Sequence, residues 1–272
     1  MSILLNLIFI VSILGQNIDS IKTAILTEGL ELYHLECAAW ISTDQILDEA
    51  FSNQYLFNGY VSYKDSNSYT TIYYDHDSFG TKIKFTAKNP IQDTINTFNT
   101  KIVKKDRTPT DYELILIKVR ENEVDLIVES PLLSKNADKI NYNIVLLDKE
   151  QQILSFLLPG SFSNSIFYVG GDYILKYSKN GEFQSIEALH KSLIPMRKLE
   201  NVGVEKSYHT HLPEFSPFMT STDICQFKLY GKSITGCIEY IVFDTLERYV
   251  SILNTETDEF SIVNASDYKE PK

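Results

Sequence analysis

Short runs of β-branched and aromatic residues, each ended by turn residues, recur through most of this chain. They limit its fold more than any other feature. Residues 60–63, 69–74 and 82–86 form the first group, and Asp, Ser, Asn and Gly separate them. Such runs predict short strands joined by tight turns. We therefore expect a small antiparallel meander in the first half of the chain.

A second group of strand-like runs follows Pro131. Its members are residues 144–147, 153–158, 166–168, 173–177 and 183–186. Pro159-Gly160 predicts a turn after the second run. Ser178-Lys179-Asn180-Gly181 contains Asn-Gly, a strong hairpin signal, and it predicts that the last two runs pair.

Helical spacing of apolar residues appears in two places. Residues 21–51 predict one helix or two, and Ser42-Thr43-Asp44 is a candidate cap for the second. Thr108-Pro109-Thr110-Asp111 predicts the start of another helix that runs to about Val128, with Pro109 at its first position. The chain thus reads as α+β, with N-terminal helices and a small antiparallel sheet preceding further strands.

Composition narrows the class of partner. The 272 residues carry a net charge of −11, and 43% of them are hydrophobic, which is enough to bury one large core or two ordinary ones. The densest basic run is Lys101, Lys104, Lys105 and Arg107, which we interpret as a solvated loop. We expect no nucleic-acid partner, because the acidic balance argues against broad contact with phosphates, which rests on clustered basic residues.

The N-terminus predicts the compartment. Residues 3–14 are almost all apolar and end at Gly15-Gln16-Asn17. That length suits the core of a signal peptide and is too short to span a bilayer. We expect residues 1–15 to be a signal peptide and the cleaved protein to be exported, periplasmic or extracellular, without a stable membrane span. The positive residues usual before such a core are missing, and the alternative is a buried strand or helix.

The three cysteines leave two interpretations open. Cys225 and Cys237 form a disulfide in one, leaving Cys37 over. In the other, all three are buried free thiols that behave as small apolar residues.

His209 and His211 end a predicted strand that begins near residue 204. Alternate residues of a strand point to one face, so both imidazoles can reach one ion. Thr220-Ser221-Thr222-Asp223 then precedes apolar residues at helical spacing, which places Asp223 in a first helical turn. Two imidazoles and a carboxylate are a common zinc ligand set. Asp223 equally serves as a charge that stabilises the helix start without a metal.

His209-Thr210-His211, followed by Thr220-Ser221-Thr222-Asp223, resembles the His-x-His…Ser-x-x-Asp signature of JAB/MPN-type (JAMM) metallopeptidases. The resemblance covers roughly residues 165–255 and includes the strands expected at 239–243 and 249–253. It implies a mixed-sheet domain over residues 136–272, after an α+β region over residues 16–135. It also implies Zn²⁺ held by His209, His211 and Asp223, with Thr220 in the place of the serine that stabilises the oxyanion. The implied activity is hydrolysis of an amide or isopeptide bond in a protein or peptide substrate.

The sequence departs from the family's pattern in three respects. The loop before Asp223 is one residue longer, and Leu212 precedes Pro213 where the proline normally follows the histidine directly. The glutamate base is missing, since Tyr168 stands at the aligned position before Gly170-Gly171 and cannot act as a base at neutral pH. Asp172, Glu187 and Glu205 are candidate substitutes for the base. His190 is a candidate further metal ligand or proton-shuttling residue, and the alternative is a partly buried structural histidine.

The chain as a whole is similar to secreted bacterial proteins of unknown activity. Residues 33–44 and 189–191, together with His209-Thr210-His211-Leu212-Pro213, carry this second likeness. Two functions therefore stay open: a zinc metallopeptidase-like hydrolase without the usual glutamate, and a non-catalytic binding or envelope-associated protein on a degenerate JAB/MPN-like fold.

Overall fold

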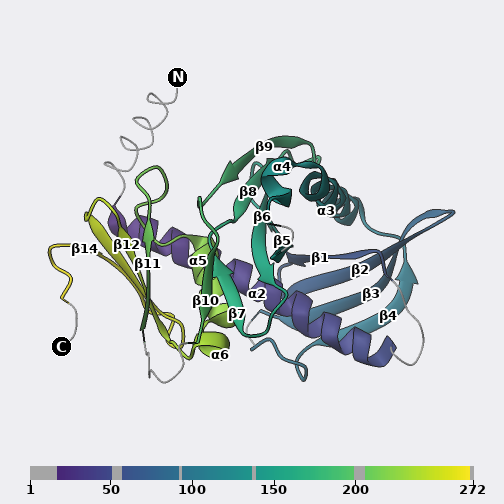
Figure 1. The fold of residues 1–272 in the computed structure, drawn as a ribbon. Coiled ribbons are helices and arrows are strands. Elements are labelled where there is room, and N and C mark those ends of the chain that lie inside the picture. Colours follow the sequence, from purple (N-terminus) through teal and green to yellow (C-terminus); the bar gives the residue numbers. More distant parts are fainter. Residues whose placement is uncertain (1–16, 51–56, 92–93, 137–138, 199–205, 270–272) are drawn as a thin grey trace. The chain divides into compact units, whose positions relative to one another are not determined.

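A computed structural model describes residues 17–50, 57–91, 94–136, 139–198 and 206–269 (Figure 1). The chain divides into two compact units. Unit 1 comprises Met1–Glu31, Ser163–Gly171 and Leu189–Lys272, and unit 2 comprises Leu32–Phe162 and Asp172–Ala188. The domain boundary expected after residue 135 falls inside unit 2. The expected signal peptide lies outside the described residues and stays a prediction.

The first helix, α2, runs without interruption over Ile18–Ala50. The prediction of a second helix capped by Ser42 is therefore wrong. The Ser42 hydroxyl donates to the carbonyl of Ala38 one turn earlier and shares a hydrogen bond of 2.7 Å with the Tyr73 hydroxyl. These bonds satisfy the serine inside a helix, so it has no need to end one.

The predicted meander is confirmed in unit 2. Strands β1 (Gly59–Lys64), β2 (Ser68–Asp77) and β3 (Gly80–Pro90) pair in chain order, all antiparallel. The basic run is a fourth strand, β4 (Lys101–Arg107), and not a loop. Most of its side chains are exposed, so hydrogen bonding to β3, which the sequence pattern does not show, makes it a strand.

A second antiparallel sheet in unit 2 has the order β5-β6-β8-β9. Its strands are β5 (Ile140–Asp148), β6 (Ile153–Ser161), β8 (Tyr173–Tyr177) and β9 (Phe183–Ala188). The hairpin at residues 178–181 is confirmed, with Gly181 in the left-handed region at φ 73°. The prediction of a turn at Pro159-Gly160 is wrong, because both residues belong to β6 and pair with β5.

Helices α3 (Asp111–Glu129) and α4 (Pro131–Ser134) complete unit 2. Thr110 is the N-cap of α3 and forms a reciprocal capping box with Glu113, so Pro109 lies outside the helix and not at its first position. Leu116 and Val119 of α3 belong to the same buried core as Leu157 and Leu175 of the second sheet.

Unit 1 holds a mixed sheet of order β11-β12-β13-β14. Its strands are β11 (Lys206–His211), β12 (Glu239–Asp244), β13 (Tyr249–Asn254) and β14 (Phe260–Asn264). Edge strand β11 runs parallel to β12, and the other pairs are antiparallel. A parallel pair needs a long crossover, which here is the helical stretch α5 (Ser221–Gln226), η1 (Phe227–Gly231) and α6 (Lys232–Thr235).

A short two-stranded sheet in unit 1 pairs β7 (Ile166–Val169) with β10 (Ile194–Arg197). Phe167 and Val169 of β7 share a core with Ile224 and Phe227 of the crossover and with Tyr240 of β12. The predicted α+β class is thus confirmed. Among the helices described, none has the length and apolar character needed to cross a membrane.

Candidate metal centre

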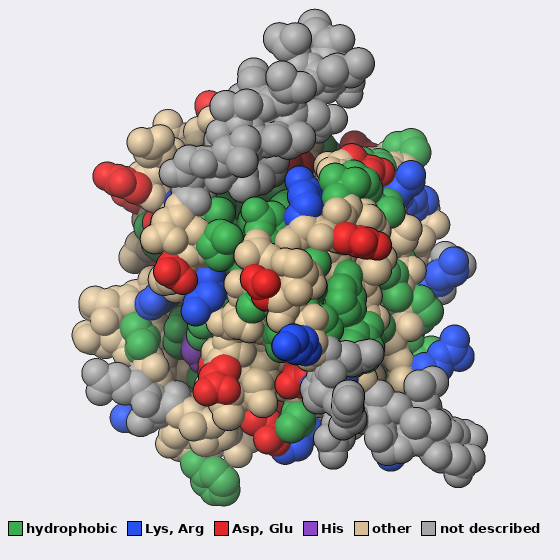
Figure 2. Space-filling view, turned by 90° about the vertical axis from the view of Figure 1, so that its left-hand side faces the viewer, with side chains coloured by type: hydrophobic (Ala, Val, Ile, Leu, Met, Phe, Trp, Pro, Cys, Tyr) green, Lys and Arg blue, Asp and Glu red, His purple; other side chains and the backbone are tan. Residues whose placement is uncertain are grey.

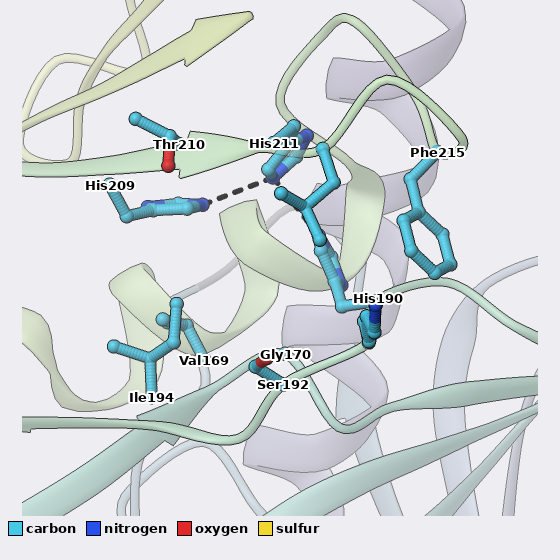
Figure 3. Close-up of a pocket in the computed structure, with 11 residues that line it drawn as sticks. Val169, Gly170, His190, Ser192, Ile194, His209, Thr210, His211 and Phe215 are labelled. Carbon is cyan, nitrogen blue, oxygen red and sulfur yellow. Dashed lines mark hydrogen bonds between the residues drawn. The ribbon is translucent and has the colours of Figure 1, made fainter. Parts of the chain in front are cut away.

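Strand β11 presents His209 and His211 on the same face. The intervening Thr210 and the preceding Tyr208 are exposed, whereas the side chains of the two histidines are only 6% and 1% exposed. This alternation is the one that the sequence predicts for a strand. The Nε2 atoms of the two histidines lie 3.1 Å apart. The dashed line in Figure 3 joins the two rings.

Asp223 is the third residue of α5, and Thr220 is the N-cap. The backbone N–H and the hydroxyl of Thr220 each donate to Oδ2 of Asp223 at 2.9 Å, and the Asp223 N–H donates back to the threonine hydroxyl. This capping box fixes the buried carboxylate at the start of the helix.

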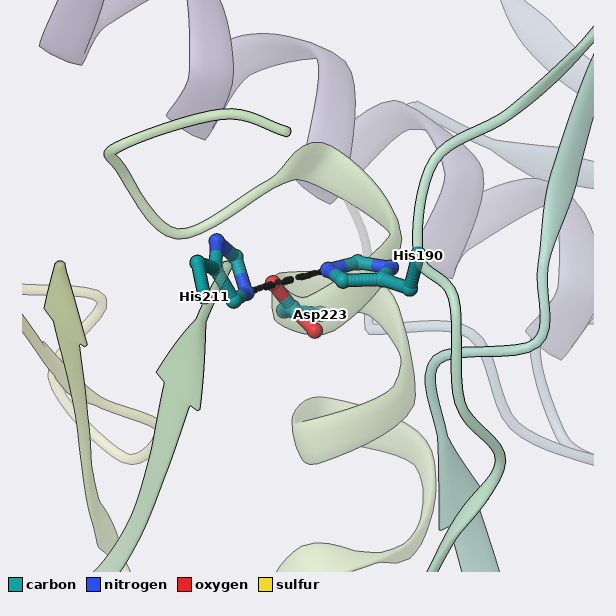
Figure 4. A group of neighbouring side chains, drawn as sticks. All are labelled: His190, His211 and Asp223. Atoms are coloured by element: carbon teal, nitrogen blue, oxygen red, sulfur yellow. Dashed lines mark hydrogen bonds and ion pairs between the residues drawn. The ribbon is translucent and has the colours of Figure 1, made fainter. Parts of the chain in front are cut away.

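His190 joins the two elements from the segment between β9 and β10. Its Nε2 lies 3.0 Å from Nε2 of His211 and 3.6 Å from Oδ2 of Asp223. His211 Nε2 in turn lies 3.2 Å from the same carboxylate oxygen. The donor atoms of these three buried residues all lie within 4.8 Å of one another (Figure 4). The cluster could therefore hold a metal ion.

The tautomer of His211 is set by the backbone. Its Nδ1 lies 3.0 Å from the carbonyl oxygen of Ser216, which can only accept a hydrogen bond, so Nδ1 carries a proton. In a neutral imidazole the other nitrogen, Nε2, then presents a lone pair. That lone pair can accept an N–H from His190 or His209, or it can bind a cation, a proton or a metal ion, shared with the Asp223 carboxylate.

The electrostatics of Asp223 agree with such a cation. Burial alone disfavours its charged form, but the charge of His190 and hydrogen bonds from His190 and His211 outweigh burial and hold the pKa of Asp223 well below its usual range. Its Oδ1 atom is buried and accepts no hydrogen bond. Nε2 of His209 lies 3.6 Å from that oxygen.

A pocket of about 160 Å³ adjoins the cluster. His190, His209 and His211 line it together with residues of β7, β10 and the segments beside them, as Figure 3 shows. The other lining residues are Val169, Gly170, Lys191, Ser192, Ile194, Thr210, Leu212 and Phe215. In the space-filling view of Figure 2, histidine occupies only a small area of the face presented.

The other predicted site residues lie elsewhere. Thr220 is not among the residues that line the pocket, and its hydroxyl is bonded to Asp223, so it positions the carboxylate. Asp172 and Glu187 belong to unit 2, and Glu205 lies outside the described residues. Tyr168 pairs with Pro195 within the two-stranded sheet. None of the lining residues in the described part of the chain carries a carboxylate.

The cysteines agree with the alternative without a disulfide, except that Cys37 is only half-buried. Cys225 and Cys237 are both buried, and neither they nor Cys37 forms a disulfide. Cys237 belongs to a buried apolar cluster with Phe227 and Tyr240 at the crossover between β11 and β12, where a small apolar residue suits the packing.

Sequence reasoning understated two features of the site. His190 appeared only as one candidate among several, because it lies in a loop with no periodic pattern to orient it. The carbonyl of Ser216 that orients His211 is a backbone group, so the type of residue at that position does not predict the contact. Comparison of the chain with protein families, curated proteins and solved structures gave no match.

Proposed function

We propose that this protein binds a zinc ion at the histidine and Asp223 cluster and hydrolyses an amide or isopeptide bond in the adjoining pocket. The observation that carries the proposal is the convergence of potential ligand atoms on Nε2 of His211. That atom lies 3.0–3.2 Å from two imidazole nitrogens and one carboxylate oxygen. Each of these atoms can offer a lone pair to a zinc ion.

The donor set fits zinc. Zinc binds imidazole nitrogen and carboxylate oxygen with bonds of about 2.0–2.2 Å, so two ligands of a tetrahedral ion lie roughly 3.4 Å apart. The separations among His190, His211 and Asp223 are 3.0, 3.2 and 3.6 Å. When bound, zinc supplies a Lewis acid that polarises a carbonyl and acidifies water.

The chain's own groups would hold and orient the substrate. Apolar lining from Val169 and Ile194 faces polar lining from Ser192 and Thr210, which suits a side chain or chain end with a polar group. The volume of about 160 Å³ admits a group of side-chain size. A protein or peptide substrate that inserts one such group is therefore our expectation.

The order of elements supports a JAB/MPN-like interpretation. A strand ends in His-x-His, a helix that begins at Ser221 carries the aspartate in its first turn, and β12 and β13 follow. The family's glutamate base has no counterpart among the described lining residues, so the proposal includes no proton transfer by a glutamate. That same observation favours the second candidate, a zinc-binding protein without hydrolytic activity. Export after removal of residues 1–15 remains part of the proposal.

Metal analysis of the purified full chain tests the site. We expect about one equivalent of zinc in the wild type and none in His211→Ala. His76→Ala is the matched control, because His76 is an exposed histidine of unit 2 that contacts Glu121. Circular dichroism checks that each variant is folded. Equal and negligible zinc in wild type and His211→Ala would contradict the proposal.

Hydrolysis separates the two candidate functions. The zinc-loaded protein is incubated with peptides and isopeptide-linked peptide pairs, with and without a chelator, and products are identified by mass spectrometry. Chelator-sensitive cleavage that is lost in His211→Ala supports the hydrolase. A zinc-loaded protein that cleaves none of them supports the non-catalytic alternative.

A further inference from the structure

The geometry points to His190, and not His209, as the second histidine ligand of the metal, alongside His211 and Asp223. This assignment rests on the proposed zinc site. It differs from the ligand set of the His-x-His…Asp signature, which uses both histidines of the strand.

The separations between donor atoms carry the assignment. His190, His211 and Oδ2 of Asp223 form a closed triangle with sides of 3.0, 3.2 and 3.6 Å (Figure 4). An ion about 2 Å from each corner fits that triangle without any side chain moving. His209 Nε2 lies about as near His211, at 3.1 Å, but it is not one of the three donors of this group, which share Oδ2. It reaches the other carboxylate oxygen, Oδ1, at 3.6 Å.

His209 approaches the cluster from a different direction. In Figure 3 its ring and that of His190 reach His211 from separate sides of the pocket. The His209 ring also lies against Phe227, with centroids 5.7 Å apart. These contacts place His209 on the wall of the pocket, beside the ligands, where it can hydrogen-bond a substrate group or a water molecule.

Close backbone packing holds His190 at the cluster. Gly170 has a φ of +69°, and a Cβ there would lie 2.3 Å from the carbonyl oxygen of Ser192 and 3.1 Å from Cβ of His190. Only glycine allows the segment of residues 190–192 to come this near the end of β7. Gly170 thus allows the ligand His190 to reach its position. The strand that ends just before Gly170 is the one that aligns with the glutamate strand of the JAB/MPN-type pattern.

Zinc affinity of single variants tests the assignment. Wild type, His190→Ala and His209→Ala are titrated with Zn²⁺ against a chromophoric chelator, and Co²⁺ absorption spectra report the ligand set. We expect His190→Ala to lose at least 100-fold in zinc affinity and to change the Co²⁺ spectrum. His209→Ala should lose less than tenfold and keep the wild-type spectrum, because it removes no ligand. Circular dichroism confirms folding in both.

The outcomes distinguish this assignment from the proposed site itself. If the wild type binds no zinc, both proposals fall. If the wild type binds zinc and His209→Ala loses it while His190→Ala retains it, the zinc site stands and the assignment is wrong. Equal large losses in both variants, with both spectra altered, would make His209 a fourth ligand and would also overturn the assignment.

Discussion

Thr220 acts on the site through hydrogen bonds to Asp223 and not through the pocket. Its hydroxyl and its backbone N–H both donate to Oδ2, the oxygen nearest His190 and His211. Groups that orient a metal ligand in this manner affect metal affinity even though they never touch the ion. The threonine is therefore a positioning residue, a role that differs from the oxyanion role implied by the family signature.

We predict that Thr220→Ala weakens zinc binding by roughly 10- to 100-fold, because the carboxylate loses a hydrogen bond that aims it. The lost cap should also lower the free energy of unfolding by about 1 kcal/mol. Thr220→Ser keeps the hydroxyl and is the control, with near wild-type affinity expected. Competition titration with Zn²⁺ measures both, and equal affinity in Thr220→Ala and wild type would refute the positioning role.

Gly170 offers a second test at the scale of a single residue. Gly170→Ala should weaken zinc binding, because the new Cβ must displace the Ser192 carbonyl and the His190 side chain. Gly236→Ala is a matched control. Gly236 is also left-handed, at φ +80°, but a Cβ there meets nothing within 4 Å. Both variants carry the backbone strain of a positive φ, so only the first should lose zinc affinity in the titration.

Among the elements, α3 carries a buried acid that makes stability depend on pH. Glu123 is fully buried, and the Ser155 hydroxyl of β6 donates to its Oε2 at 2.8 Å. Burial raises the pKa of Glu123 from 4.5 to about 8, although the bond from Ser155 acts in the opposite direction. The folded protein therefore keeps a proton at neutral pH that the unfolded chain releases.

The sign of the effect follows from that difference. The stabilising contribution of the protonated Glu123 is complete below pH 4.5 and is lost as pH rises toward about 8. Relative to Glu123→Gln, which stays neutral, the wild type should lose roughly 1.4 kcal/mol for each pH unit over this interval. Urea unfolding of both proteins at pH 5, 6.5 and 8 measures it. If the free energies of unfolding of the two proteins differed by the same amount at all three pH values, Glu123 would not be a buried neutral acid.

The same elements show how far sequence reasoning reaches. Strands with an apolar face, such as β2 and β12, and the capped starts of α3 and α5 follow from local patterns, and so does the pairing of His209 with His211 on one face. Strand β4 does not, because its residues are mostly exposed and its identity comes from pairing with β3. The position of His190 does not follow from a local pattern either. It depends on close packing against Gly170, which lies 20 residues earlier in the sequence, and no periodicity predicts such a contact.

At the scale of the whole molecule, α2 is one continuous helix that contributes to both compact units. Ile25 and Leu26 near its start pack against the core of unit 1, while Ile46 near its end belongs to a core of unit 2. A helix forms and melts cooperatively, so the stretch between these residues should couple the unfolding of the two units.

Zinc provides the means to test that coupling. An ion that binds only the folded site stabilises it by about 2.7 kcal/mol at a free concentration 100 times its Kd. The ligands lie in unit 1, whereas Trp40, the single tryptophan of the chain, lies on α2 in unit 2. We predict that zinc raises the thermal midpoint reported by Trp40 fluorescence by the same amount as the midpoint reported by circular dichroism. His211→Ala should show neither shift. If zinc moved the circular dichroism transition and left the Trp40 transition unchanged, the two units would unfold independently despite the shared helix.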